Sequence, residues 1–236
     1  MSTVYLHMGM PKTATTALQR FFLQNTKALN DRGFAYPLMP FHFDNVPQAR
    51  AAHFLTLFRE KKKHPEWKEG FEVLKETAKE YENILISDER MWSVQRKKGF
   101  WKQTKKGFAD AGLDWKVIVY LRRQDEQMES HWNQKVKEPK THMSESFAEY
   151  LEMGLYKYMP FHYDEALDRI SQRIGKENII VRVYEKQQFV GGNIFADFLN
   201  ALGLGFDADF QMPEYTANVR LPGNAVEIKR MVNALY

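Results

Sequence analysis

The sequence predicts an α/β fold in which helices cover both faces of a central parallel sheet. Its 236 residues are enough for one sizeable core, and we expect a single domain over residues 1–236. Four short apolar runs are rich in Val, Ile or Leu, as is typical of strands that are buried on both faces. Helical patterns lie between these runs, and such alternation indicates a doubly wound α/β protein.

The individual elements follow from these two patterns. Strands are predicted where the apolar runs occur, at 3–8, 83–87, 115–121 and 178–184. Helices are predicted where apolar residues recur every three or four positions, at 15–31, 47–60, 66–81, 94–111, 124–137, 145–152, 160–174, 192–203 and 224–235. Ligands of such sheets bind beyond the carboxyl ends of the strands, so we expect functional residues there.

The composition excludes several classes of protein. There is no cysteine, which removes disulfides, thiolate metal sites and cysteine nucleophiles and suits a reducing compartment. No apolar run approaches the roughly 18 residues of a membrane span, and no basic leader precedes the first apolar run. We therefore expect a cytoplasmic protein. The net charge of +4 comes without an aromatic-interleaved recognition motif, so no nucleic-acid partner is expected.

The stretch after the first predicted strand is the most informative part of the chain. Residues 9–16 read Gly-Met-Pro-Lys-Thr-Ala-Thr-Thr, and a helical pattern follows at once. A strand that leads through a loop into a helix directs several backbone N–H groups and the positive end of the helix dipole at one point. Lys12 adds a mobile positive charge, and three threonine hydroxyls add donors. This arrangement predicts a phosphate-binding loop.

This loop differs from a Walker A motif, which requires a glycine directly before the lysine. Pro11 occupies that position and removes one amide donor from the loop. Ala14 occupies a position at which such a loop can carry a second glycine.

A second candidate binding element follows the third predicted strand. Arg122 stands at the end of that strand, and Ser130 lies eight residues later, about two helical turns into the next helix. A guanidinium at a strand end and a hydroxyl on the adjoining helix can converge on one oxyanion, which the guanidinium binds in a bidentate manner.

Together these two elements resemble the cytosolic and Golgi sulfotransferase superfamily, and bacterial sulfotransferase-like proteins in particular. That family uses 3′-phosphoadenosine-5′-phosphosulfate and has a P-loop-like, three-layer fold. Its Pro-Lys-Thr/Ser-Gly-Thr-Thr loop binds the 5′-phosphosulfate, and residues 11–16 are similar to this loop. The resemblance implies that the donor is bound by Lys12, Thr13, Ala14, Thr15 and Thr16, that Arg122 and Ser130 bind its 3′-phosphate, and that Tyr184 lies near its adenine.

The chain departs from the family pattern at three places. Ala14 replaces the usual glycine of the loop, although only glycine adopts positive φ without cost. Ala17 stands where an aromatic residue often stacks on the adenine. The late Arg-Lys-Gly loop, a second clamp on the 3′-phosphate, is not recognisable, and Arg220 is the candidate substitute.

A general base is needed to take the proton of the acceptor hydroxyl, and the family uses either His or Glu for this. Glu89, at the end of the second predicted strand, is the first candidate. His53, on a predicted helix, and His42, in the preceding loop, are the alternatives. With Lys12, these residues form the predicted catalytic set.

We therefore expect a sulfotransferase that moves a sulfuryl group to an acceptor hydroxyl, with a carbohydrate or glycan as the favoured acceptor and without a metal ion. One alternative is a nucleoside-triphosphate hydrolase or kinase, because Asp88 and Glu89 follow a strand as in a Walker B motif, where the Asp holds Mg²⁺. Another alternative is a nucleotide-binding protein without turnover.

Overall fold

In the computed structural model of the chain, the described residues are 1–138, 140–154, 161–213 and 223–235. They belong to two compact units. One unit comprises Met1–Leu121 and Tyr163–Glu214, and the other comprises Arg122–His162 and Tyr215–Tyr236.

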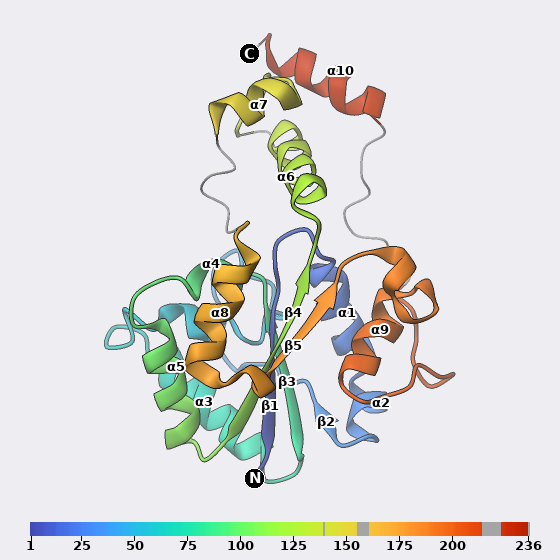
Figure 1. Ribbon diagram of the computed structural model, residues 1–236. Helices are drawn as coiled ribbons and strands as arrows, with labels where there is room; N and C mark the ends of the chain where they lie inside the picture. Colours follow the sequence, from blue (N-terminus) through green and yellow to red (C-terminus); the bar gives the residue numbers. More distant parts are fainter. Residues whose placement is uncertain (139, 155–160, 214–222, 236) are drawn as a thin grey trace. The chain divides into compact units, whose positions relative to one another are not determined.

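The first unit is built on a five-stranded sheet in which all strands are parallel and follow the order β2-β3-β1-β4-β5 (Figure 1). The strands are β1 (Thr3–Met8), β2 (Phe34–Ala35), β3 (Asn83–Asp88), β4 (Asp114–Leu121) and β5 (Ile179–Val183). The predicted α/β fold with a central parallel sheet is confirmed. The sequence did not predict β2, because two residues are too few to show a pattern. Met8 pairs with Asp88, so β1 and β3 end side by side.

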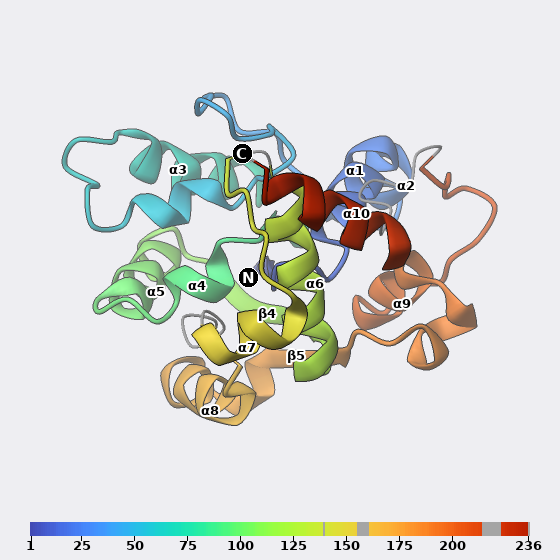
Figure 2. The ribbon, with the colours of Figure 1, turned by 90° about the horizontal axis from the view of Figure 1, so that it is seen from above.

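Helices cover both faces of this sheet, as Figures 1 and 2 show from two directions. One face carries α3 (Glu66–Thr77), α4 (Met91–Val94), α5 (Phe100–Asp110) and α8 (Tyr163–Ile174). The other face carries α1 (Thr15–Gln24), α2 (Thr26–Asn30) and α9 (Ile194–Ala201). Short 3₁₀ turns complete the unit at η1 (His53–Leu57), η3 (Lys176–Asn178), η4 (Lys186–Gln188) and η5 (Val190–Gly192).

The two helical layers pack through aromatic side chains. Under α3 and α5, Phe71 contacts Phe108 with ring centroids 5.3 Å apart, and Phe108 stacks on Trp115 of β4 at 4.8 Å. On the opposite face, Phe21 of α1 stacks on Phe195 of α9 at 4.7 Å. The four phenylalanines belong to one buried core, and the partly buried Trp115 packs against it.

The prediction of a helix at 47–60 is wrong except at the 3₁₀ helix His53–Leu57, because the chain forms turns before residue 53 and again at residues 58–60. The backbone there makes turn hydrogen bonds and also bonds to distant parts of the fold. The amide of Ala52 donates to the carbonyl of Ser87 at 3.2 Å, and the Tyr36 hydroxyl donates to the carbonyl of Ala49 at 2.5 Å. The helix predicted at 94–111 is also interrupted, because Gly99 has φ of 94° and separates α4 from α5.

In its described residues, the second unit contains α6 (Gln124–Lys137), α7 (Phe147–Met153) and α10 (Gly223–Asn233). Its small core contains the buried side chains of Trp132, Val136, Met143, Tyr150 and Val226. Asn233 joins α10 to α6, since its amide nitrogen donates to the carbonyl of Val136 at 2.9 Å and to that of Met143 at 2.8 Å.

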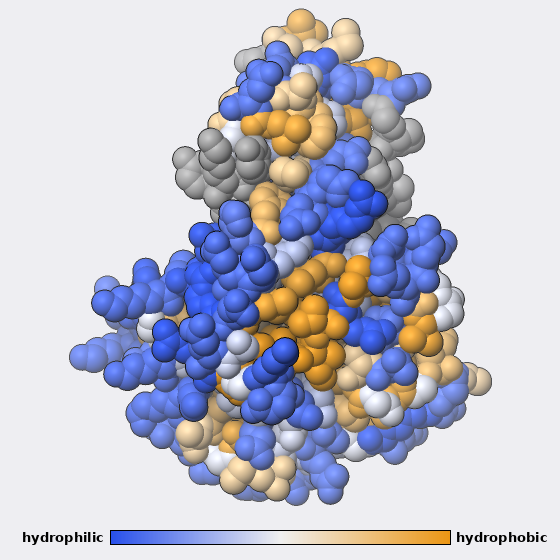
Figure 3. Space-filling model, viewed as in Figure 1, coloured by the Kyte–Doolittle hydropathy of each residue, from blue (hydrophilic) through white to orange (hydrophobic). Residues whose placement is uncertain are grey.

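Some apolar side chains of the first unit are open to solvent. Figure 3 shows apolar surface over β5, where Val181 and Val183 are each 44% exposed. Among the described residues, no helix is long and apolar enough to cross a membrane.

Candidate functional site

The loop between β1 and α1 has an unusual backbone. Lys12 and Ala14 both have positive φ, 70° and 58°, and Ala14 is the N-cap of α1 in the left-handed conformation. The hydroxyl of Thr13 donates to the carbonyl of Met10 at 2.7 Å, and the hydroxyl of Thr15 donates to the same carbonyl at 3.4 Å. Both threonines are buried, so their side chains brace the loop from within.

Gly9 allows the loop to approach the end of β3. A Cβ atom at Gly9 would lie 2.6 Å from the Thr15 side chain and 3.0 Å from the Cα of Glu89. Neither distance leaves room for another side chain. The start of α1 and the residues that follow β3 therefore lie together, as the carboxyl-end argument predicted.

The first turn of α1 is suited to an anion. No side chain caps it, so its N-terminal amides are left for another partner. Thr16 is partly exposed and its hydroxyl makes no hydrogen bond among the described residues, so it is the threonine hydroxyl of this loop that is available to a ligand. The sequence predicts the same phosphate-binding role for Thr13, Thr15 and Thr16. In the structure, Thr13 and Thr15 are buried, and Thr16 is partly exposed.

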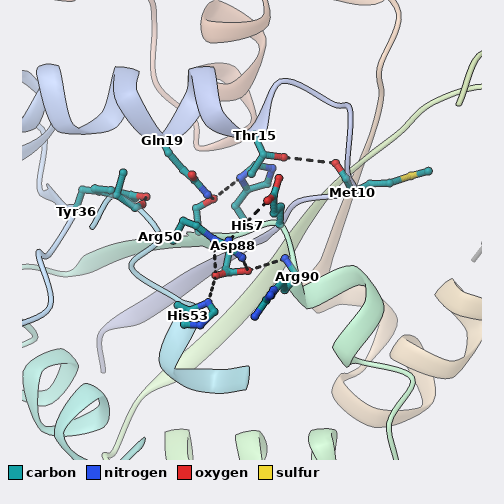
Figure 4. Close-up of polar contacts among 12 residues, drawn as sticks. His7, Met10, Thr15, Gln19, Tyr36, Arg50, His53, Asp88 and Arg90 are labelled. Carbon is teal, nitrogen blue, oxygen red and sulfur yellow. Dashed lines mark hydrogen bonds and ion pairs between the residues drawn. The ribbon is translucent and has the colours of Figure 1, made fainter. Parts of the chain in front are cut away.

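A polar cluster surrounds Asp88 at the end of β3 (Figure 4). Arg50 donates to both carboxylate oxygens, from Nη2 at 2.6 Å and from Nε at 2.9 Å. The Nδ1 atom of His53 lies 2.9 Å from one of these oxygens, and the amide of Arg90 donates to the other at 2.6 Å. The Asp88 carboxylate is fully buried and is satisfied by these four contacts.

The charges of this cluster are balanced. Burial by itself raises the pKa of Asp88, but hydrogen bonds from His53 and Arg50 outweigh it, so the pKa lies below its usual value. Asp88 is therefore ionised at neutral pH and acts only as an acceptor of hydrogen bonds.

The three predicted candidates for the base lie differently. His53, the first residue of η1, is 5% exposed, and the ring of Phe43 lies 4.9 Å away at an angle of 61°. The Glu89 side chain is 42% exposed, and its carboxylate lies 3.7 Å from Arg50. His42 is exposed and lines a small hollow beside Arg50 with Phe43. The structure brings His53 and Glu89 to the same arginine.

His7 is buried in β1. Its Nδ1 atom lies 2.9 Å from the hydroxyl of Ser87, which also accepts a hydrogen bond from Gln19 at 3.1 Å. Burial lowers the pKa of His7 to about 3, so its ring is neutral at physiological pH. Its Nε2 atom is buried, so bulk water does not reach it, and it has no hydrogen-bond partner among the described residues.

The predicted 3′-phosphate residues lie in the second unit. Arg122 comes just before α6, and its Nε atom donates to Glu126 of the first helical turn at 3.0 Å. Ser130 lies on α6, is partly exposed, and makes no hydrogen bond with its side chain among the described residues. The neighbouring Arg123 is exposed and pairs with Asp125 at 2.7 Å.

The remaining predicted residues are Tyr184 and Arg220. Tyr184 follows β5, its amide donates to the carbonyl of Leu121 at 2.8 Å, and its ring lies 5.5 Å from that of Phe189. Arg220 lies outside the described residues.

Sequence reasoning missed the partners of His53. Asp88 was assigned only to the alternative Mg²⁺ site, and Arg50 was not considered. The two residues are 38 positions apart, and no local spacing connects them. In the described part of the chain, no group of three or more His, Asp or Glu side chains is arranged to hold a metal ion.

No protein-family model matches the chain. It is 38% identical to an uncharacterized protein of Archaeoglobus fulgidus over 89 residues, a match that covers 38% of this chain and only 22% of that protein.

Two solved structures are similar to it. A sulfotransferase from Alicyclobacillus acidocaldarius aligns over 98% of this chain and 94% of its own, with a TM-score of 0.53 and 15% identity. The sulfotransferase domain from the curacin biosynthetic pathway aligns over 96% of this chain and 82% of its own, with a TM-score of 0.44 and 12% identity. The similarity to the Alicyclobacillus acidocaldarius structure confirms the predicted P-loop-like, sulfotransferase-like fold.

Proposed function

We propose that the protein is a sulfotransferase that transfers the sulfuryl group of 3′-phosphoadenosine-5′-phosphosulfate to an acceptor hydroxyl. The observation that carries this proposal is the β1–α1 loop, in which Lys12 precedes an uncapped helix start within a sulfotransferase-like fold. The amides of the loop and of the α1 N-terminus bind the 5′-phosphate. Fold alone supports many chemistries, so the proposal depends on this loop.

In the proposed reaction, the acceptor oxygen forms a bond to sulfur while the bond between sulfur and the bridging oxygen breaks. The electron pair of that bond leaves with the 5′-phosphate, and the product is adenosine 3′,5′-bisphosphate. Lys12 stabilises the charge that develops on the bridging oxygen. A base accepts the proton of the acceptor hydroxyl, and Glu89 and His53 are the candidates next to Arg50.

The remaining donor contacts come from the resemblance. Arg122 and Ser130 bind the 3′-phosphate and so select this donor over ATP, and Tyr184 contacts the adenine. The pair between Arg122 and Glu126 supports such a role, since it holds the guanidinium in one place until a phosphate competes for it. Arg220 stays a candidate for a second contact with the 3′-phosphate.

The acceptor that we propose is a carbohydrate or other glycan hydroxyl, which is supported by the family resemblance and by the aromatic hollow beside Arg50. We also propose that the chain acts as one sulfotransferase-like domain and, because it lacks cysteine, that it works in the cytoplasm.

The geometry disfavours the hydrolase or kinase alternative. A Walker B aspartate needs a carboxylate oxygen that faces Mg²⁺, but both oxygens of Asp88 already accept hydrogen bonds from Arg50. A protein without turnover is also disfavoured. Ala14 adopts the positive φ that a glycine would supply, so its presence leaves the loop conformation intact.

The first test is calorimetric titration of the purified protein with adenosine 3′,5′-bisphosphate and, separately, with ATP and Mg²⁺. We expect tight binding of the bisphosphate and weak binding of ATP.

Arg122→Ala should weaken bisphosphate binding about 10- to 100-fold, as expected when a phosphate loses a charged donor. The matched control is Arg123→Ala, which removes the exposed neighbouring arginine and should leave the affinity unchanged.

The opposite preference, for ATP over the bisphosphate, would overturn the proposal. Equal losses of bisphosphate affinity in the two arginine variants would show that Arg122 is not part of the donor site.

Lys12→Ala should lower kcat about 10²- to 10³-fold in a sulfotransfer assay, since it removes a transition-state contact. Wild-type turnover in that variant would contradict the role of Lys12.

A further inference from the structure

We propose that His53 is the general base and that Asp88 and Arg50 are the positioning residues that hold it in one tautomer. This inference rests on the proposed sulfotransfer, and it assigns the base that the sequence left open. Figure 4 shows the three side chains in contact at the end of β3. His53 lies 2.9 Å from Asp88 through Nδ1, and Arg50 binds both oxygens of the same carboxylate.

The tautomer follows from the charges of the cluster. Arg50 can only donate hydrogen bonds, and it donates two to Asp88. The carboxylate is fully buried and accepts a further hydrogen bond from the Arg90 amide, so it has no proton to give. The contact at Nδ1 of His53 therefore requires that Nδ1 carries the hydrogen. The neutral ring then has its lone pair on Nε2, the nitrogen that has no partner among the described residues.

The neighbouring groups fix the orientation of the His53 ring as well as the position of its hydrogen. The amide of His53 donates to the carbonyl of Arg50 at 2.9 Å, and the preceding amide of Ala52 donates to Ser87 of β3 at 3.2 Å. Phe43 packs edge to face against the imidazole. Backbone and side chain are thus both tied to the strand end, which is the precision that proton transfer needs.

The arrangement favours His53 over Glu89 as the base. An imidazole ordinarily takes up a proton nearer to neutral pH than a carboxylate does, and efficient bases have a pKa near the working pH. The Glu89 side chain is 42% exposed, and its carboxylate lies 3.7 Å from the Arg50 guanidinium, which is beyond hydrogen-bond distance. When the acceptor proton reaches Nε2, the resulting imidazolium is stabilised by the Asp88 carboxylate on its other side.

Arg50 limits where that proton can go. Because it neutralises much of the Asp88 charge through two hydrogen bonds, the carboxylate stays ionised and the proton stays on the ring. The charged groups around His53 are Asp88 of β3, which it contacts, and Arg50, which binds the same carboxylate, while Glu89 lies 3.7 Å from Arg50. His42 lines the hollow with Arg50 and Phe43.

The direct test needs neither donor nor acceptor. Long-range ¹H–¹⁵N correlation spectra of the wild-type protein report which ring nitrogen of each of its seven histidines carries hydrogen. The signals missing from His53→Gln identify those of His53. We expect the neutral form of His53 to carry its hydrogen on Nδ1. Hydrogen on Nε2, or a mixture of the two forms, would overturn the proposal.

The second test compares two buried aspartates that each bind an arginine. Asp88→Asn removes the acceptor of His53, and its amide can donate to Nδ1 and so reverse the tautomer. We expect kcat to fall about 10²- to 10⁴-fold, with unchanged affinity for adenosine 3′,5′-bisphosphate. The acidic limb of the pH–rate profile should move to lower pH, because the imidazolium loses its counter-charge.

Asp197→Asn is the matched control. Asp197 is 1% exposed and binds Arg182 and the Tyr120 hydroxyl, far along the chain from His53. Its substitution should lower stability to a similar degree, yet leave the His53 tautomer and the acidic limb in place. A wild-type kcat and profile in Asp88→Asn, or the same shift in both variants, would refute the positioning role. If Asp88→Asn does not fold, the wild-type spectrum decides.

Discussion

At the scale of single residues, Ala14 carries a local strain that its neighbours maintain. An L-residue in the left-handed region costs about 1 kcal/mol, whereas glycine adopts this conformation freely. The Thr13 and Thr15 hydroxyls and their shared acceptor on Met10 brace the backbone around Ala14. The loop thus keeps the shape of a glycine-containing loop without the glycine.

Replacing Ala14 by glycine should therefore stabilise the protein. We expect Ala14→Gly to raise the free energy of unfolding by about 0.5–1 kcal/mol, measured by urea denaturation. Ala17→Gly is the control, since Ala17 lies inside α1 and the same substitution should cost about 1 kcal/mol there. If Ala14→Gly destabilises as much as Ala17→Gly, the left-handed conformation at Ala14 is wrong.

At the scale of elements, side-chain hydrogen bonds help to hold the helices of the second unit together. Asn233 supplies two of them, because its side chain is 3% exposed and bonds to both Val136 and Met143. We expect Asn233→Ala to speed hydrogen exchange in α10 roughly in line with a loss of 1–3 kcal/mol, since two buried carbonyls lose their donor.

Exchange in β1 should not change in that variant. Met231→Ala serves as the control, because Met231 is 62% exposed on the same helix and alanine does not weaken the helix. If both variants accelerate exchange in α10 equally, the Asn233 contacts do not hold the helix.

Much of the element pattern could be predicted from the sequence, because continuous apolar runs identify buried strands. The strand at Thr3–Met8 and the helix at Gln124–Lys137 match the prediction at both ends. The segment before His53 could not be predicted, since its backbone bonds to β3 instead of forming a helix. Periodicity reports which face of a segment is apolar, but it does not report hydrogen bonds between distant segments.

The same limit applies to the candidate site. The sequence predicted the loop around Lys12, and the structure gives it a helix start without a cap. The sequence also proposed Glu89 and His53 as alternatives. The contact that distinguishes them joins His53 to Asp88 across 35 residues, so it became visible only in the fold.

At the scale of the whole molecule, buried ionisable groups make the stability depend on pH. The pKa of His7 is about 3 in the folded chain, and an unfolded histidine has a pKa of about 6.5. Between these values the unfolded chain binds more protons than the folded chain. The stability from a neutral His7 is therefore complete above about pH 6.5 and is lost as the pH falls toward 3.

We expect acid to destabilise the protein well before its carboxylates titrate. The free energy of unfolding should fall by up to about 1.4 kcal/mol for each pH unit below 6.5, measured by urea denaturation between pH 7 and pH 5. His7→Gln should flatten this slope, because it removes the titrating ring. His162→Gln, at an exposed position, should leave it as in the wild type. An unchanged slope in His7→Gln would contradict this account.

Below about pH 4 a second loss should follow. The pKa values of Asp88 and Asp197 lie below the ordinary value, because hydrogen bonds to their arginines outweigh the effect of burial. Their contribution is present above the unfolded pKa of about 3.9 and disappears as the pH drops through the folded values.

The bracing of the β1–α1 loop also bears on how fast a ligand associates. Thr13 and Thr15 hold the loop through contacts to Met10 that involve no ligand. The conformational entropy of the loop is therefore lost during folding and not when a ligand binds. An anion therefore meets a loop that is already ordered, and no slow rearrangement of the loop has to precede binding. We therefore expect the association rate to follow diffusion and charge, to decline as salt is added, and to depend little on temperature beyond the viscosity of water.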